Sequence, residues 1–151
     1  MFDYWCARGA DGRLARRADI NPADLKSLLP SLSLLDVLDG DGALRLRVRL
    51  AGTRLRDYLG METTGRCIDE FDLGDQRAYW DAAYREVAGA LHPAQGVVPL
   101  TPWNKPHIFQ FWLRLPLVDD EGRIAMVLGH DAFLQSEKAH ALASRANLRI
   151  A

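Results

Sequence analysis

Residues 43–51, which read ALRLRVRLA, alternate between apolar side chains and arginines. A period of two places successive side chains on opposite faces of a β-strand, whereas the apolar side of a helix recurs every three or four residues. A strand with one apolar and one charged face is typical of an antiparallel sheet that is covered on one side. We therefore expect the inner face to carry Leu44, Leu46, Val48 and Leu50. The outer face should carry Arg45, Arg47 and Arg49.

Four further stretches have strand character, and turn residues separate several of them. The expected strands cover residues 31–39, 43–51, 92–100, 107–118 and 123–134, with hairpin turns at 39–42 and 119–122. The expected helices cover residues 1–9, 21–30, 53–58 and 74–91, and 135–151 is a helix or a frayed end. Two strands, a helical segment and then three strands predict an α+β domain built on one antiparallel sheet.

The bulk properties restrict the class of protein and its partners. A chain of 151 residues with 48% hydrophobic and 26% charged residues is expected to form one globular core. A net charge of −1 gives no general attraction to nucleic acid or an anionic membrane. The sequence shows neither an apolar run long enough to span a bilayer nor a signal pattern, so we expect a cytoplasmic protein.

The cysteines and histidines do not have the spacing of a metal site. Cys6 and Cys67 lie far apart, and no two of the four histidines are paired as zinc ligands usually are. We also find no glycine-rich phosphate loop and no nucleophile–base pair that spacing alone would identify. The sequence therefore predicts no metal site and no catalytic residues.

Three stretches of the chain share a family's pattern when they are taken in order. They are YWCARGADGRLARRADINPADLKSLLPSLSLLDV near the N-terminus, RLAGTRLRDYLGMETTGRCIDEF after it, and LRLPLVDDEGRI near the end. Together they resemble a stand-alone bacterial PAS-type domain family that was formerly a family of unknown function. The resemblance extends from residue 4 to about residue 129. The chain departs from the family pattern at Ala15, where proline is expected, and at Asn21, where an acidic residue is expected.

The resemblance implies a PAS-like fold: a five-stranded antiparallel sheet with helices over its inner face and a flanking N-terminal helix. It divides the chain into N-terminal flanking helices and connector (1–30), a PAS-like core (31–134) and a C-terminal tail (135–151). PAS domains typically sense and transmit rather than catalyse, and they often hold a small molecule between sheet and helices. A sensor of this kind would signal through a separate partner protein.

The expected cavity is the default binding site, because ligand pockets are mostly apolar with a few polar groups. Alternate residues of strand 107–118 form two sets, one containing Phe109 and the other containing Gln110. We place the Phe109 set on the inner face of the sheet. The candidate ligand-binding residues are Tyr58, Trp80, Tyr84, His107, Phe109, Phe111 and Met126. The same aromatics at helical or strand spacing can equally be core packing.

The second set of strand 107–118 would then share the outer face with the arginines. A tryptophan on such a face needs a cover, which the N-terminal segment or a second subunit could provide. The candidate interface of a homodimer or an N-terminal helix is Tyr4, Trp5, Arg45, Arg47, Arg49, Trp112 and Arg114. A solvated face with one partly covered aromatic is the alternative.

The sequence thus predicts a non-catalytic PAS-type sensor that binds a small apolar or aromatic ligand, a protein partner, or both. The alternatives are a small cone-shaped α+β enzyme with an apolar cavity and a ligand-free dimeric interaction module. PAS relatives that form a cysteinyl adduct with a flavin carry an asparagine–cysteine motif on a helix, whereas Cys67 follows Thr-Gly-Arg in a loop. Flavin photochemistry of this kind is therefore not expected. The sequence does not identify a ligand or a cofactor.

Overall fold

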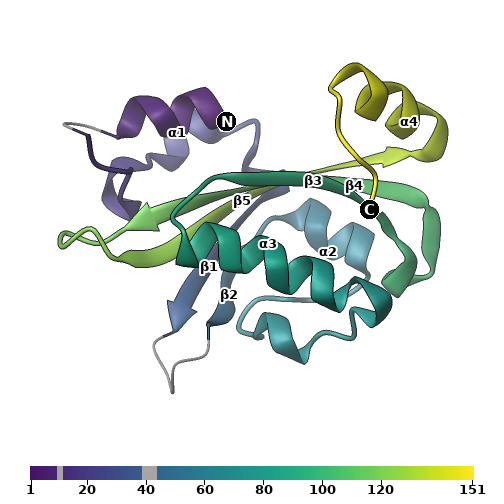
Figure 1. Cartoon of the computed structure of the whole chain (residues 1–151), viewed down its shortest axis with the longest axis horizontal. Coiled ribbons are helices and arrows are strands. Elements are labelled where there is room, and N and C mark those ends of the chain that lie inside the picture. Colours follow the sequence, from purple (N-terminus) through teal and green to yellow (C-terminus); the bar gives the residue numbers. More distant parts are fainter. Residues whose placement is uncertain (10–11, 39–43) are drawn as a thin grey trace.

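Five antiparallel strands form one sheet in the order β2–β1–β5–β4–β3 (Figure 1). The computed structural model describes residues 1–9, 12–38 and 44–151. The strands are β1 (Leu32–Leu38), β2 (Arg45–Ala51), β3 (Ala94–Leu100), β4 (Lys105–Val118) and β5 (Ile124–Gln135). The predicted five-stranded antiparallel sheet is therefore confirmed, whereas the predicted turn at 39–42 lies outside the described residues.

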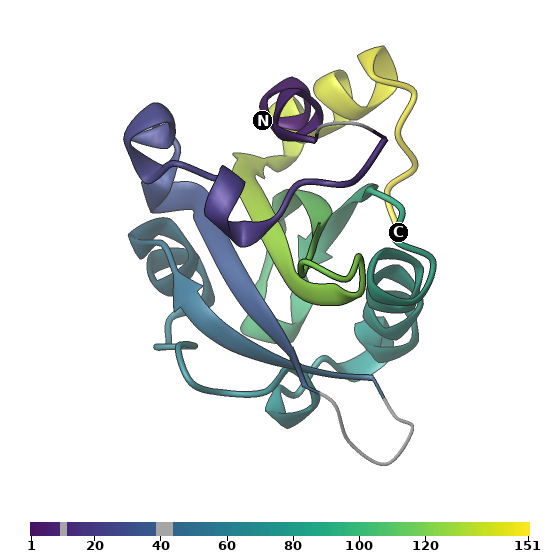
Figure 2. The same ribbon diagram turned by 90° about the vertical axis from the view of Figure 1, so that its left-hand side faces the viewer.

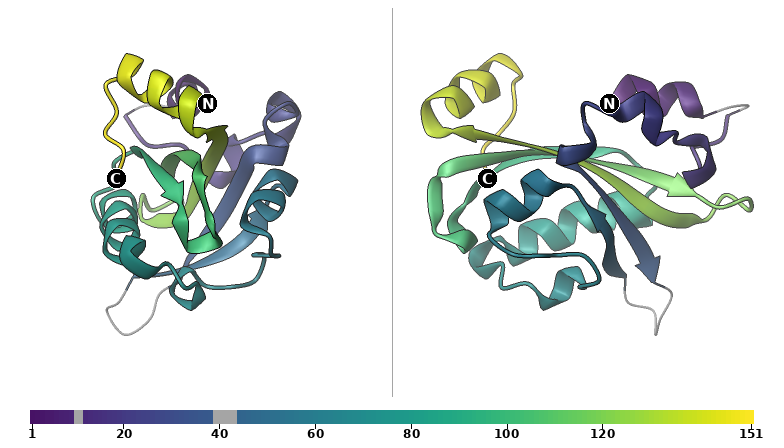
Figure 3. Two further views of the ribbon diagram at one scale, coloured as in Figure 1. Left: turned by 90° about the vertical axis from the view of Figure 1, so that its right-hand side faces the viewer. Right: turned by 180° about the vertical axis from the view of Figure 1, so that it is seen from behind.

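The helices lie on both faces of this sheet. On the inner face are α2 (Thr53–Leu59) and α3 (Arg77–Gly89), and on the outer face are α1 (Phe2–Arg8) and α4 (Ser136–Arg145) (Figure 3). The N-terminal segment (residues 1–9 and 12–31) and α4 lie on the same side of the sheet (Figure 2), toward opposite ends of the molecule (Figure 1). The tail after α4 returns to β3, where Ile150 bridges Val97.

The helix expected over 21–30 is wrong. Two short 3-10 turns occupy this stretch, Pro22–Leu25 and Leu29–Ser31. Asn21 does cap the first turn, since its side-chain oxygen accepts from the Ala23 amide at 3.1 Å. Pro30 has no amide hydrogen and restricts the residue before it, so a continuous α-helix cannot run through this short segment.

A β-bulge changes the expected orientation of β2. Leu35 pairs with Val48, but its neighbour Leu34 pairs with Leu50, so Arg49 is an extra residue. One extra residue exchanges the faces of the strand beyond it. Leu46 and Val48 are buried on the inner face as predicted. Leu50 lies instead on the outer face with 51% of its surface exposed, and Leu44 is exposed as well.

The core is divided by the sheet into an inner and an outer part. The inner part includes Leu35, Val48, Trp80, Val87 and Trp112. The outer part has two clusters, one beneath the N-terminal segment and one beneath α4. Strands β4 and β5 are thus covered on both faces, and alternation along them does not separate buried from exposed positions.

Candidate functional site

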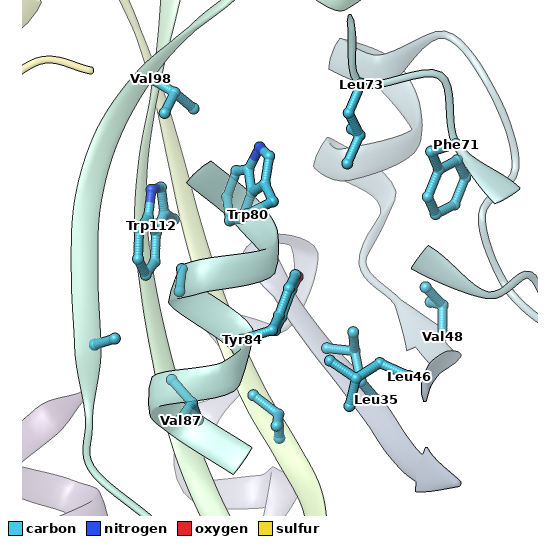
Figure 4. Packing of buried hydrophobic residues seen from close by; sticks show 13 residues of the cluster. Leu35, Leu46, Val48, Phe71, Leu73, Trp80, Tyr84, Val87, Val98 and Trp112 are labelled. Carbon is cyan, nitrogen blue, oxygen red and sulfur yellow. The ribbon is translucent and has the colours of Figure 1, made fainter. Parts of the chain in front are cut away.

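A small cavity lies between the inner face of the sheet and the segments α2 and α3. Its volume is about 70 Å³. Trp80 and Tyr84 of α3 stand on one side of this space, and Leu73, Phe71 and Val48 stand opposite (Figure 4). The lining residues are Ser33, Leu35, Val48, Leu55, Leu59, Thr63, Ile68, Phe71, Leu73, Trp80, Tyr84, Trp103, Gln110 and Arg114.

Trp80 and Tyr84 of α3, two of the predicted ligand-binding residues, line the cavity. Trp80 and Tyr84 lie one helical turn apart, so both side chains leave the helix on the same side. Their rings are stacked with centroids 5.8 Å apart, and both are buried. The structure therefore places both at the cavity, and their binding of a ligand stays a prediction.

The assignment of the two faces of β4 is wrong. Trp112 packs in the inner core, and Gln110 and Arg114 line the cavity, whereas we expected all three on the outer face. Phe109 lies in the outer cluster beneath α4, where His140 packs edge-on against its ring. The prediction places Arg114 at the surface because its side chain is charged. In the structure Arg114 is buried, because the opposite charge of Asp131 lies beside it.

Four other predicted cavity residues also lie elsewhere. His107 is exposed on the outer-face side of β4, and Phe111 packs at the cluster beneath α4. Met126 packs on the outer face against the cluster beneath the N-terminal segment. Tyr58 of α2 is half-buried and stacks on Phe133 with ring centroids 4.2 Å apart, and it does not line the cavity.

The charged centre of the inner face is the pair formed by Arg114 of β4 and Asp131 of β5. Arg114 donates to the Asp131 carboxylate at 2.9 and 3.2 Å, and both side chains are almost completely buried. Gln110 donates to the same carboxylate at 2.7 Å. Burial lowers the pKa of Arg114, but the charge of Asp131 and the Tyr84 hydroxyl outweigh it, so its pKa lies above the ordinary value.

Aromatic rings surround this guanidinium. The Arg114 guanidinium carbon lies 5.5 Å from the centroid of the Trp80 ring and 5.8 Å from that of Trp112. The Trp112 indole in turn donates to the Tyr79 hydroxyl at 3.1 Å. These cation–π contacts and hydrogen bonds fix the Arg114 side chain at the wall of the cavity.

Two polar groups at the cavity have no hydrogen-bond partner among the described residues. They are the hydroxyl of Ser33 and the indole nitrogen of Trp80, both buried. Gly129 of β5 makes room beside the first of them. A Cβ atom at this position would lie 2.2 Å from the Ser33 hydroxyl oxygen and 3.1 Å from a terminal nitrogen of Arg114.

The N-terminal segment covers part of the outer face of the sheet. Trp5 of α1 packs against Leu115 and Leu117, and its indole donates to the Pro116 carbonyl at 2.9 Å. Tyr4 is tied to the next turn, because its hydroxyl accepts from the Asn21 amide at 2.9 Å. The expected cover by the N-terminal segment is present, although Trp112 is not beneath it.

The three arginines of β2 are exposed and ion-paired. Arg47 and Arg49 both approach Asp36 of β1, at 3.0 and 3.4 Å. Arg45 pairs instead with Asp69 at 3.0 Å. The arginines are therefore available for an interface, but nothing in the described chain lies over them as a partner.

One group of candidate metal ligands gathers at the loop after α2. Cys67, Asp69 and Glu70 bring their ligand atoms within 4.8 Å of one another. Arg45 lies 3.0 Å from Asp69 and 3.6 Å from Glu70. Arg66 also lies 3.8 Å from Glu70, so two arginines balance the two carboxylates, which does not favour a cation.

Sequence reasoning missed Ser33, Gln110 and Asp131. A signal for the charged pair was present: Arg114 and Asp131 each stand alone within a long apolar strand. Isolated opposite charges in two apolar strands indicate a buried ion pair, because an unpaired buried charge is too costly. Ser33 had no such signal.

Comparisons with known proteins come from sequence and from structure. A family model described as "PAS domain" matches residues 1–131. No curated protein matches the chain. Within the described residues, no helix has the length and apolar character needed to cross a membrane.

Three solved structures illustrate the similarity in fold. A light-oxygen-voltage domain studied with a flavin analogue is 13% identical, with a TM-score of 0.60, over 83% of this chain and 92% of that one. The dark structure of the Aureochrome1 LOV photoreceptor is 13% identical, with a TM-score of 0.59, over 89% and 98%. The LOV protein of Rhodobacter sphaeroides is 16% identical, with a TM-score of 0.55, over 84% and 77%.

Proposed function

Because this chain belongs to the PAS domain family, we propose that it is a non-catalytic sensory domain that binds a small ligand in the inner cavity and signals through a protein partner. The observation that carries this proposal is the cavity itself. It is enclosed by apolar and aromatic side chains of α2, α3 and the sheet, and a few polar groups converge on it. That composition is typical of sites for small molecules.

The polar groups of the cavity support binding better than catalysis. A general base needs a carboxylate or imidazole that can reach a substrate proton. The Asp131 carboxylate accepts hydrogen bonds from Arg114 and Gln110, and it does not line the cavity. This arrangement weighs against the cone-shaped enzyme as the alternative function.

A flavin, such as the analogue studied in one of the LOV neighbours, does not fit the inner face. A cavity of about 70 Å³ is far below the 300–1,000 Å³ or so of sites for larger ligands. The packed rings of Trp80 and Trp112 lie on the inner face, with Arg114 beside both of them. Cys67 begins a 3-10 turn and does not line the cavity. We therefore derive no step through a flavin.

The outer layer provides a route from the cavity to a partner. Arg114 lines the cavity, and the adjacent Leu113 and Leu115 point to the other face, toward the N-terminal segment. Helix α4 continues directly from β5, the strand that carries Asp131. We propose that a ligand which shifts β4 and β5 alters α1 and α4, and that these helices or the paired arginines of β2 contact a partner protein or a second copy of the chain.

Native mass spectrometry of the freshly purified chain tests the proposal, with an absorption spectrum of the same sample. We expect a small bound mass on a dimer, and the bound mass should disappear in Leu55→Phe, which places a larger side chain in the cavity wall. The matched control Leu142→Phe changes an exposed residue of α4 and should keep the bound mass. A clean polypeptide mass in the unchanged protein would favour the ligand-free interaction module.

A further inference from the structure

Resting on that proposed function, we propose that the cavity ligand is a small uncharged molecule whose apolar body carries a hydrogen-bond-acceptor oxygen, as a ketone does. Two buried polar groups carry this inference. The indole nitrogen of Trp80 and the hydroxyl of Ser33 belong to cavity-lining residues, each only 4% exposed, and have no partner in the described part of the chain. An unsatisfied buried donor is costly, so a ligand that accepts from it is favoured.

Three residues of the cavity lining can donate a hydrogen bond to a ligand. The indole nitrogen of Trp80 can only donate. The Tyr84 hydroxyl accepts from the Arg114 Nε at 3.4 Å, which leaves its own proton for another acceptor. The Ser33 hydroxyl can also donate. A ligand oxygen with two lone pairs complements this set, whereas a pure hydrocarbon leaves the donors unsatisfied.

The charges around the cavity favour an uncharged ligand. The positive charge of Arg114 is already balanced by Asp131 through two hydrogen bonds at 2.9 and 3.2 Å. A carboxylate would have to compete with Asp131 for the guanidinium, and one of the two anions would then be buried without a partner. An ammonium ion would meet Arg114 at the wall, since Asp131 does not line the cavity.

Size and shape limit the ligand further. A cavity of about 70 Å³ is small beside the 300–1,000 Å³ or so of sites for larger ligands, so it accommodates only a small molecule. Phe71, Trp80, Tyr84 and Trp103 provide aromatic walls. A single saturated or aromatic ring with one carbonyl oxygen matches this space.

Titration of the ¹⁵N-labelled protein tests the inference with three probes: cyclohexanone, methylcyclohexane of the same size, and cyclohexanecarboxylate. We expect cyclohexanone to bind most tightly and to move the indole N–H resonance of Trp80 downfield. Trp80→Phe removes this donor, and it should reduce the preference for cyclohexanone over methylcyclohexane about five- to ten-fold, the effect of one hydrogen bond. Ser33→Ala should reduce it by a similar or smaller factor.

The matched control is Trp5→Phe. Trp5 lies on the outer face of the sheet and does not line the cavity, so the same exchange of ring should leave the preference unchanged. Equal binding of cyclohexanone and methylcyclohexane, tighter binding of the carboxylate, or an unchanged preference in Trp80→Phe would overturn the inference and leave a ligand cavity in place. Binding of none of the three probes would overturn the inference and, together with a clean native mass, the proposed function as well.

Discussion

The inner and outer faces of strands β4 and β5 bury their side chains in different ways. On the outer face, Leu115, Leu117 and Leu128 pack against apolar residues of the N-terminal segment. On the inner face, the same strands carry Arg114 and Asp131, which are buried just as completely. Apolar packing tolerates exchanges of similar volume, whereas a buried ion pair fails when either partner is lost. The comparison indicates that the inner face is specified by polar contacts and the outer face by volume.

Replacing Arg114 with methionine should have the largest effect. It leaves the Asp131 carboxylate buried beside Gln110 without its cation, and the free energy of unfolding should fall by about 3–5 kcal/mol. Urea unfolding followed by circular dichroism measures this loss.

Two further variants sharpen that result. The double variant Arg114→Met with Asp131→Leu removes both charges and should regain most of the lost stability. Arg47→Met removes an exposed arginine that is also paired with an aspartate, and should cost no more than about 1 kcal/mol. Equal losses in Arg114→Met and Arg47→Met would contradict the idea that the inner face depends on its charges.

Replacing Trp5 with phenylalanine should have an intermediate effect on the outer face. The ring volume is largely kept, but the Pro116 carbonyl loses its indole donor, so the loss should be about 1–3 kcal/mol. Faster amide hydrogen exchange in α1 should accompany it. Cys6→Ser, at an exposed position of the same helix, is the control and should change neither measurement. An unchanged stability in Trp5→Phe would mean that volume alone holds the segment.

The smallest expected effect is the pH dependence due to His130 of β5. Burial lowers the pKa of this half-buried imidazole, the chain's amino terminus and Arg114 lower it further, and Asp131 opposes them. The unfolded state therefore binds a proton more readily, and the free energy of unfolding should fall as the pH decreases below about 6.5. His130→Gln should flatten the curve between pH 7 and 5. Parallel curves for the two proteins would show that His130 does not contribute.

The sequence located the strands well because their boundaries depend on local features. Alternation and turn residues lie within a few positions of one another, and the predicted strand 107–118 corresponds to β4 (Lys105–Val118). The faces of β4 could not be assigned in this way. Alternation separates two sets but does not say which set is inside, and here both faces are covered. The burial of Arg114 depends on its partner Asp131, which lies on the next strand and 17 residues further along the chain.

The candidate site was predictable only where one helix determined it. The spacing of Trp80 and Tyr84 fixes a shared face of α3, and both residues line the cavity. Leu50 was misplaced because the extra residue Arg49 changes the parity of β2, and a bulge without glycine or proline leaves no local signal. Ser33 reaches the cavity only through the pairing of β1 with β5, which is a property of the sheet.

Gly129 restricts which residues can occur together at neighbouring positions in relatives of this chain. Because a side chain there would collide with the Ser33 hydroxyl and crowd Arg114, the three positions cannot drift independently. A relative that carries alanine or a larger residue at the position of Gly129 should also have lost the serine or the arginine. Positions 33, 114 and 129 should therefore change together among relatives, and their combinations would sort the family into members with and without this polar cavity wall.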